Sequence, residues 1–230
     1  ALMTPLLIGV FGVSAPVAIA TDLLFATVTK IIGVVAHGRA GQVDWKLAGK
    51  LWAGSLPAVA AGSLLLVGFV TSGYITWITW LLVAFVALTS YTLIRRGLQS
   101  TAISPSTEAR AAPKWLAPLG GAGVGLGVSL TSVGAGVLGM ALLVRLSPPD
   151  TSPRKLVATD LVHAIPIALI AGISYTISGL VDWQLLTTLL IGSIPGVIVG
   201  ALLSKFVPAR ALNLGLGVVL GALAMSLVIL

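Results

Sequence analysis

Two aspartates lie within long apolar stretches of the chain, and each directly follows a threonine: Thr21 precedes Asp22, and Thr159 precedes Asp160. A carboxylate is costly inside a lipid bilayer, so an aspartate within a membrane span is a candidate for function. Because burial favours the protonated form, each carboxyl group could take up and release a proton within the membrane. The alternatives are a structural hydrogen bond and, for Asp160, a cap or an ion pair with Lys155.

His163 lies four residues after Thr159 and therefore on the same helical face. It could join a proton path with the two aspartates, or it could be a satisfied histidine in the core. The hydroxyl groups of Thr21 and Thr159 are candidates for binding the solute beside that path. Lys30 is a lone base within an apolar stretch, and snorkelling of its side chain to the interface is the favoured interpretation.

Four residues in the middle of another apolar stretch are candidates for binding an anion: Thr131, Ser132, Gly134 and Gly136. Backbone N–H groups at a helix N-terminus can hold an anion without a full positive charge, and glycines let it approach the backbone closely. The alternative is close packing of helices through small residues. That interpretation is favoured for the preceding glycines, which are Gly120, Gly121, Gly123, Gly125 and Gly127.

The composition of the 230 residues explains where these candidates must lie. The chain is 57% hydrophobic and 8% charged, with a mean hydropathy of +1.11, which is outside the range of ordinary soluble domains. Its basic residues give a net charge of +7 but stand singly or in pairs between apolar runs, as topology signals do. We therefore expect a multi-pass protein of a bacterial inner membrane, with lipid as a partner and no nucleic acid.

The absence of cysteine excludes disulfides, thiolate metal sites and a cysteine nucleophile. No nucleotide-binding loop is present, and we expect no cofactor and no metal site.

Apolar runs cover residues 2–12, 14–36, 46–69, 75–94, 115–146, 156–179, 183–204 and 211–230. Helices are expected throughout, because backbone exposed to lipid must satisfy its own hydrogen bonds. The one extended polar stretch, 98–113, predicts a cytoplasmic linker between two membrane units at 1–97 and 114–230.

The two units are copies of one sequence. Residues 20–62 align without a gap on residues 158–200, with 17 identical pairs among 43, including polar, Trp and Pro matches in a single register. In each copy an aspartate, Asp44 or Asp182, precedes a tryptophan at an expected helix start, so both are interpreted as structural N-caps.

The placement of lysine and arginine predicts that the two copies are inverted in the membrane. Bases follow the Ala-Thr-Asp run in the first copy and precede it in the second. Inversion requires an odd number of crossings per copy, or three crossings and a hairpin that enters and leaves on one side. The stretch 115–146 is long for one helix and short for two spans, so it is expected to be a re-entrant hairpin with its tip near Ser132. Residues 1–12 would be the returning arm of an equivalent first hairpin whose other parts are absent. Gly73 and Gly179 should face outward, and Ser104 and residues 205–210 the cytoplasm.

The chain resembles the TauE/SafE sulfite exporter family, also called the TSUP family. The resemblance rests on four motifs: Gly-Ala-Gly at 134–136, the paired Ala-Thr-Asp-Leu segments, Gly-x-Val-Asp-Trp at 41–45, and the two Gly-Ser-(Leu/Ile)-Pro segments. It implies transport of sulfur-containing anions such as sulfite or organosulfonates by a secondary transporter.

Two other functions remain open at this point. A channel-like or structural membrane subunit would use the carboxylates only for capping and packing. An intramembrane hydrolase would pair a serine with His163 or His37, although no serine has a nucleophile-elbow sequence.

Overall fold

The computed structural model describes residues 2–36, 43–73, 75–98, 115–133, 136–148, 150–203 and 209–229. These residues form nine helices and no strand, so the prediction of an all-α protein is confirmed. In chain order the helices are α1 (Met3–Gly9), α2 (Ala15–Ala36), α3 (Trp45–Thr71), α4 (Ile75–Leu98), α5 (Leu116–Thr131), α6 (Val137–Leu146), α7 (Pro153–Ile177), α8 (Trp183–Leu203) and α9 (Ala209–Ile229). The expected linker at 98–113 lies almost entirely outside the described residues.

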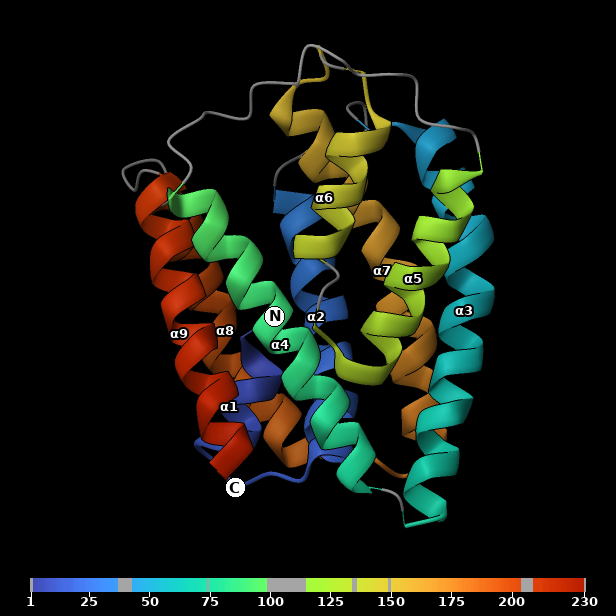
Figure 1. Cartoon of the computed structure of the whole chain (residues 1–230), viewed down its shortest axis with the longest axis vertical. Helices are drawn as coiled ribbons and strands as arrows, with labels where there is room; N and C mark the ends of the chain where they lie inside the picture. The colour runs from blue at the N-terminus through green and yellow to red at the C-terminus, as the bar shows by residue number, and fades with distance from the viewer. Residues whose placement is uncertain are drawn as a thin grey trace.

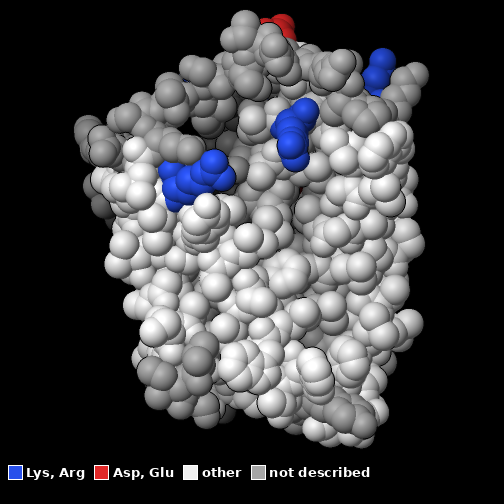
Figure 2. All heavy atoms as spheres, viewed as in Figure 1, with Lys and Arg blue, Asp and Glu red and all other residues white. Residues whose placement is uncertain are grey.

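Within the described residues, four helical segments are long and apolar enough to cross a membrane: Ala15–Ile32, Trp45–Thr71, Thr76–Arg95 and Arg154–Ile177. Large apolar side chains such as Leu64, Trp77 and Ile191 point away from the protein and are more than half exposed. A surface of this kind is stable in lipid and unstable in water. In Figure 2 the lysine and arginine side chains on this face gather toward one end of the molecule, as expected of a topology signal.

The long helices run alongside one another in a bundle (Figure 1), and their starts repeat at the sequence offset. Helices α2 and α7 begin at Ala15 and Pro153, and α3 and α8 begin at Trp45 and Trp183, an offset of 138 residues in both cases. The caps repeat as well. Asp44 Oδ1 accepts a hydrogen bond from the Leu47 N–H at 3.0 Å, and Asp182 Oδ1 accepts one from the Leu185 N–H at 2.9 Å. The structural role expected for these two aspartates is therefore confirmed.

Helices of the first half of the chain pack mainly on helices of the second half. Helix α2 packs on α7 and α8, α3 packs on α7, and α4 packs on α9. Since α7 and α8 correspond to α2 and α3 in sequence, the α2–α8 and α3–α7 contacts join equivalent pairs of helices.

The stretch 115–146 is interrupted where the glycines and hydroxyls predicted a break. Helix α5 ends at Thr131, Ser132 adopts a left-handed conformation with φ of 55°, and α6 begins at Val137. Figure 1 shows that α5 and α6 form a hairpin whose tip lies at mid-height of the bundle. A serine in the left-handed region is strained and persists only where its surroundings hold it.

Glycines let α5 lie directly against α3. A Cβ added to Gly121 would meet the carbonyl group of Leu51, and one added to Gly125 would meet the backbone of Ser55. Gly120 and Gly127 contact the side chains of Leu142 and Phe85. These contacts confirm the packing interpretation for four of the five glycines, but nothing lies within 4 Å of a Cβ added to Gly123.

Candidate functional site

Asp22 joins three parts of the chain through one oxygen. The Thr4 hydroxyl of α1 donates to Asp22 Oδ2 at 2.6 Å, and the Ser132 hydroxyl at the hairpin tip donates to the same oxygen at 2.8 Å. Asp22 and Ser132 are 3% and 7% exposed, so these hydrogen bonds form in a dry environment, where they are strong. The aspartate of α2 thus holds the tip of the broken hairpin.

The tip itself is braced by Thr131. Its hydroxyl donates to the carbonyl oxygen of Gly127 at 2.6 Å, and it also accepts from the N–H of Val133 at 3.2 Å. Tyr175 of α7 donates its hydroxyl to the Ser129 carbonyl oxygen at 2.7 Å. The Thr131 hydroxyl therefore fixes the end of α5, and its role in binding a solute stays a prediction. Gly134 lies outside the described residues.

Asp160, the sequence equivalent of Asp22, has a different environment. It is 6% exposed, and its Oδ1 has no hydrogen-bond partner among the described residues. A Cβ on Gly139 of α6 would meet this oxygen, so α6 passes directly beside the carboxyl group at Gly139. A buried polar atom without a partner is uncommon in a folded protein and indicates a site where a ligand, water or proton can bind.

His163 lies one turn beyond Asp160 on α7 and is 1% exposed. Its Nε2 is 3.1 Å from the Ser55 hydroxyl of α3, and its Nδ1 has no partner in the described part of the chain. The Trp52 indole of α3 also donates to the His163 carbonyl oxygen at 3.2 Å. The ring is therefore anchored through Nε2, while its Nδ1 is buried without a partner among the described residues.

Thr21 and Thr159 lie at two equivalent junctions between the halves. The Asp44 N–H donates to Thr159 Oγ1 at 3.0 Å, and the Asp182 N–H donates to Thr21 Oγ1 at 3.2 Å. In each case the threonine of one half stabilises the N-terminus of a helix of the other half. Both hydroxyls are thus engaged within the chain, which supports a positioning role, and solute binding by them stays a prediction.

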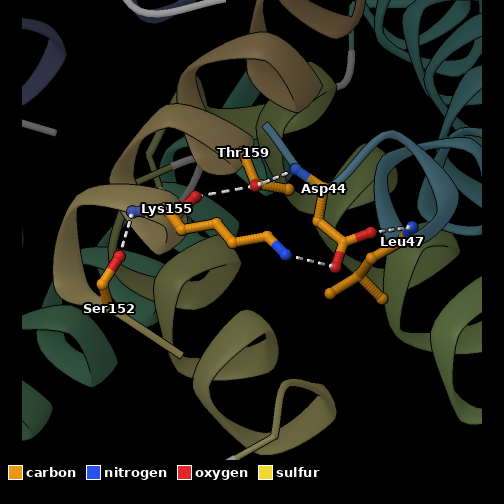
Figure 3. Close-up of polar contacts among 5 residues, drawn as sticks. All are labelled: Asp44, Leu47, Ser152, Lys155 and Thr159. Atoms are coloured by element: carbon orange, nitrogen blue, oxygen red, sulfur yellow. Dashed lines mark hydrogen bonds and ion pairs between the residues drawn. The ribbon is translucent and has the colours of Figure 1, made fainter. Parts of the chain in front are cut away.

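The junction at Asp44 has an additional ion pair (Figure 3). Lys155 Nζ lies 3.4 Å from Asp44 Oδ2, so Lys155 pairs with Asp44 and not with Asp160. Ser152 caps the N-terminus of α7, accepting a hydrogen bond from the Lys155 N–H at 3.3 Å, so Asp160 is not that cap either. The hydrogen bond from the Leu47 N–H, together with the positive charge of Lys155, holds the pKa of Asp44 below its ordinary value.

This shift predicts an acid-sensitive contribution to stability. A carboxyl group with a lowered folded-state pKa stabilises the fold above its unfolded-state pKa of about 3.9, and that stability is lost as the pH falls through the folded-state pKa. Asp44→Asn keeps a capping side chain but cannot titrate, so its melting temperature should fall less between neutral pH and about pH 3 than that of the wild type. The matched change Asp150→Asn, at an exposed aspartate, should leave the acid-dependent fall unchanged. Equal falls in all three proteins would contradict this role of Asp44.

Two residues at the site, Thr4 and Gly139, have no signal in the sequence analysis, and Ser55 appears there only as part of a Gly-Ser-Leu-Pro motif. Thr4, Ser55 and Gly139 contact Asp22, His163 and Asp160 from helices far away in the sequence. Small polar residues and glycines are common in membrane helices, so their types alone do not distinguish them. No group of three or more histidine and acidic side chains among the described residues could hold a metal ion.

Comparison with known proteins relates these features to a family. The family model described as "Sulfite exporter TauE/SafE" matches residues 1–227. This chain belongs to the TauE/SafE sulfite exporter family. It is 33% identical over 225 residues to the "Probable membrane transporter protein YjnA" of Bacillus subtilis (strain 168), which covers 93% of this chain and 85% of that protein. It is 27% identical over 212 residues to "Probable membrane transporter protein YdhB" of the same organism, covering 88% and 80%.

No solved structure matches the chain. Its place in the TauE/SafE family makes it a multi-pass membrane transporter and not an enzyme, which rejects the intramembrane hydrolase.

Proposed function

We propose that this TauE/SafE protein is a secondary transporter of small anions, in particular sulfur-containing anions such as sulfite or an organosulfonate, coupled to protons. The observation that carries the proposal is the hydrogen bond from Ser132 to Asp22. It joins a helix break within the bundle, where a solute can meet backbone N–H groups, to a buried carboxylate that can carry a proton.

The architecture we propose is a pair of inverted repeats, 1–97 and 114–230, joined by a cytoplasmic linker at 98–113. The exchanged α2–α8 and α3–α7 contacts and the two equivalent threonine junctions support it. In this arrangement α5 and α6 form a re-entrant hairpin that enters and leaves on the cytoplasmic side. Rocking of one repeat against the other would then expose the central site alternately to the two sides of the membrane.

The anion would bind at the N-terminus of α6, beside the hairpin tip. Gly136 precedes α6, so no side chain caps the N-terminus of this helix. A Cβ added to Gly136 would meet nothing within 4 Å. The first N–H groups of a helix are attracted to negative charge, so this end of α6 suits an oxyanion. Ser132 and Gly134 would complete the site at the tip, with Thr131 fixing its geometry.

Protons would be carried by Asp22, Asp160 and His163. All three side chains are buried, and Asp160 and His163 each retain an atom without a partner in the described chain. Neutralising a carboxylate beside the anion reduces the repulsion between the two negative charges, which couples the binding of a proton to that of the anion.

The proposal is tested by flux measurements on the purified protein in liposomes, with sulfite, sulfate, thiosulfate and an organosulfonate as probes. We expect a pH gradient to accelerate uptake of at least one sulfur-containing anion, and Asp160→Asn to abolish that acceleration. Uptake that is indifferent to the gradient in the wild type would favour a channel-like protein. The absence of uptake for every probe would overturn the proposed substrate class.

A further inference from the structure

The two carboxylates near the hairpin tip would repel a bound anion. An anion at the N-terminus of α6 would lie near Asp160, which contacts α6 at Gly139, and near Asp22, which holds Ser132. Two carboxylates repel an anion strongly in a medium of low dielectric constant, and the partial charge of a helix end is too small to offset both. A positively charged group is needed close by.

The geometry of α2 and α7 places Lys30 between the two carboxylates. The start of α2 contacts the segment after α7, and the start of α7 contacts the segment after α2, so the two helices are antiparallel. A Cβ on Gly172 would meet Leu24, which fixes their relative height. At a rise of 1.5 Å per residue, the backbone of Lys30 lies about 12 Å in height from that of Asp22 and about 9 Å from that of Asp160. The long side chain of Lys30 can bring its ammonium group closer to either carboxylate than these backbone distances.

The burial and the contacts of the Lys30 side chain agree with this placement. Its side chain is half-buried, and the described residues give it no hydrogen bond and no ion pair. Lys30 is thus a half-buried base within a membrane span, and it has no partner among the described residues.

We propose that Lys30 is the cationic group that holds the transported anion, and that Asp160 competes with the anion for it. With Asp160 ionised, the carboxylate and the ammonium group balance each other. When Asp160 takes up a proton, the ammonium group is released to the anion, so one proton and one negative charge enter the site together. This inference rests on the proposed anion transport and deepens it by naming the residue that recognises the charge.

The other ionisable groups on the helices packed around Asp160 are few. They are Asp22 on α2, Arg145 on α6, Arg154, Lys155, His163 and Tyr175 on α7, and Lys46 and Lys50 at the start of α3 next to Asp44. Lys155 is engaged by Asp44. Helix α5 has no ionisable side chain. Lys30 is therefore the base within the described spans that lies closest to mid-height.

The test compares Lys30→Met with Lys50→Met, which removes the same charge from an exposed position at the start of α3. Sulfite binding to the purified proteins is measured by calorimetry at acidic and neutral pH, and folding by the melting temperature. Lys30→Met should weaken sulfite binding by about tenfold or more, because a charge-assisted hydrogen bond is lost. Lys50→Met should bind as the wild type does, and Lys30→Arg should restore part of the affinity.

A second comparison tests the competition. Asp160→Asn should bind sulfite at neutral pH as tightly as the wild type does at acidic pH, and adding Lys30→Met to it should remove that affinity. Unchanged sulfite affinity in a folded Lys30→Met protein would overturn the role of Lys30 while leaving anion transport standing. A wild-type protein that neither binds nor transports any of the four probes would overturn the proposed function, and this inference with it.

Discussion

Gly121→Ala is expected to destabilise the protein and to loosen the hairpin, although it adds a single methyl group. The added Cβ would meet the carbonyl group of Leu51, which belongs to the backbone of α3 and cannot turn aside. Overpacking of this kind costs about 1–3 kcal/mol. Because α5 would be pushed away from α3, Ser132 should also lose its fixed position next to Asp22, and transport should fall with stability.

The matched control is Gly123→Ala, two residues along the same helix. Nothing lies within 4 Å of a Cβ at Gly123, and alanine favours the helix over glycine by up to about 1 kcal/mol. This variant should melt at or above the temperature of the wild type in detergent or nanodiscs. Similar melting temperatures for the two variants would show that α5 does not pack on α3 through Gly121.

The contrast between these glycines illustrates what the sequence predicts well and what it does not. The glycine-rich pattern of 115–136 predicts both a break in the helix and close packing, and the structure has both. Which glycine contacts which helix depends on the direction of each residue around α5. Gly121 and Gly123 point about 200° apart, at 100° per residue, and the position of α3 decides which of them is packed. That position results from the tertiary fold.

The boundaries of the helices follow from local signals where these exist. The apolar pattern predicts a run from residue 156, but α7 begins at Pro153. Ser152 supplies the cap and proline is favoured in the first turn, so this earlier start is encoded in polar residues that a hydrophobic pattern overlooks.

The site was only partly predictable. The aspartates within the spans were identified because a buried carboxylate is costly anywhere in a bilayer. The same rule applies to Lys30, but its distance from the helix end favours snorkelling, and only the packing of α2 against α7 places it at a height between those of the two carboxylates. The partners of Thr21 and Thr159 are 161 and 115 residues away in the sequence, and no local pattern predicts such contacts.

The largest difference between equivalent positions is expected at the two aspartates themselves. Asp22→Ala would leave the hydroxyls of Thr4 and Ser132 without their acceptor in a dry environment. Each buried polar group left unsatisfied costs about 1–3 kcal/mol, so the loss of stability should reach several kcal/mol. Asp160→Ala removes a carboxyl group whose Oδ1 has no partner in the described chain, and it should cost much less.

Asp22→Asn separates the structural part of this role from the charge. The asparagine side-chain oxygen can still accept from Ser132 and Thr4, so the variant should melt close to the wild-type temperature. It should nevertheless alter the pH dependence of transport, since the amide cannot titrate. The measurement is a melting curve for all three variants beside anion flux as a function of pH. If Asp22→Ala and Asp160→Ala were destabilised equally, the hairpin tip would not depend on Asp22, and the two repeats would be equivalent in chemistry as well as in sequence.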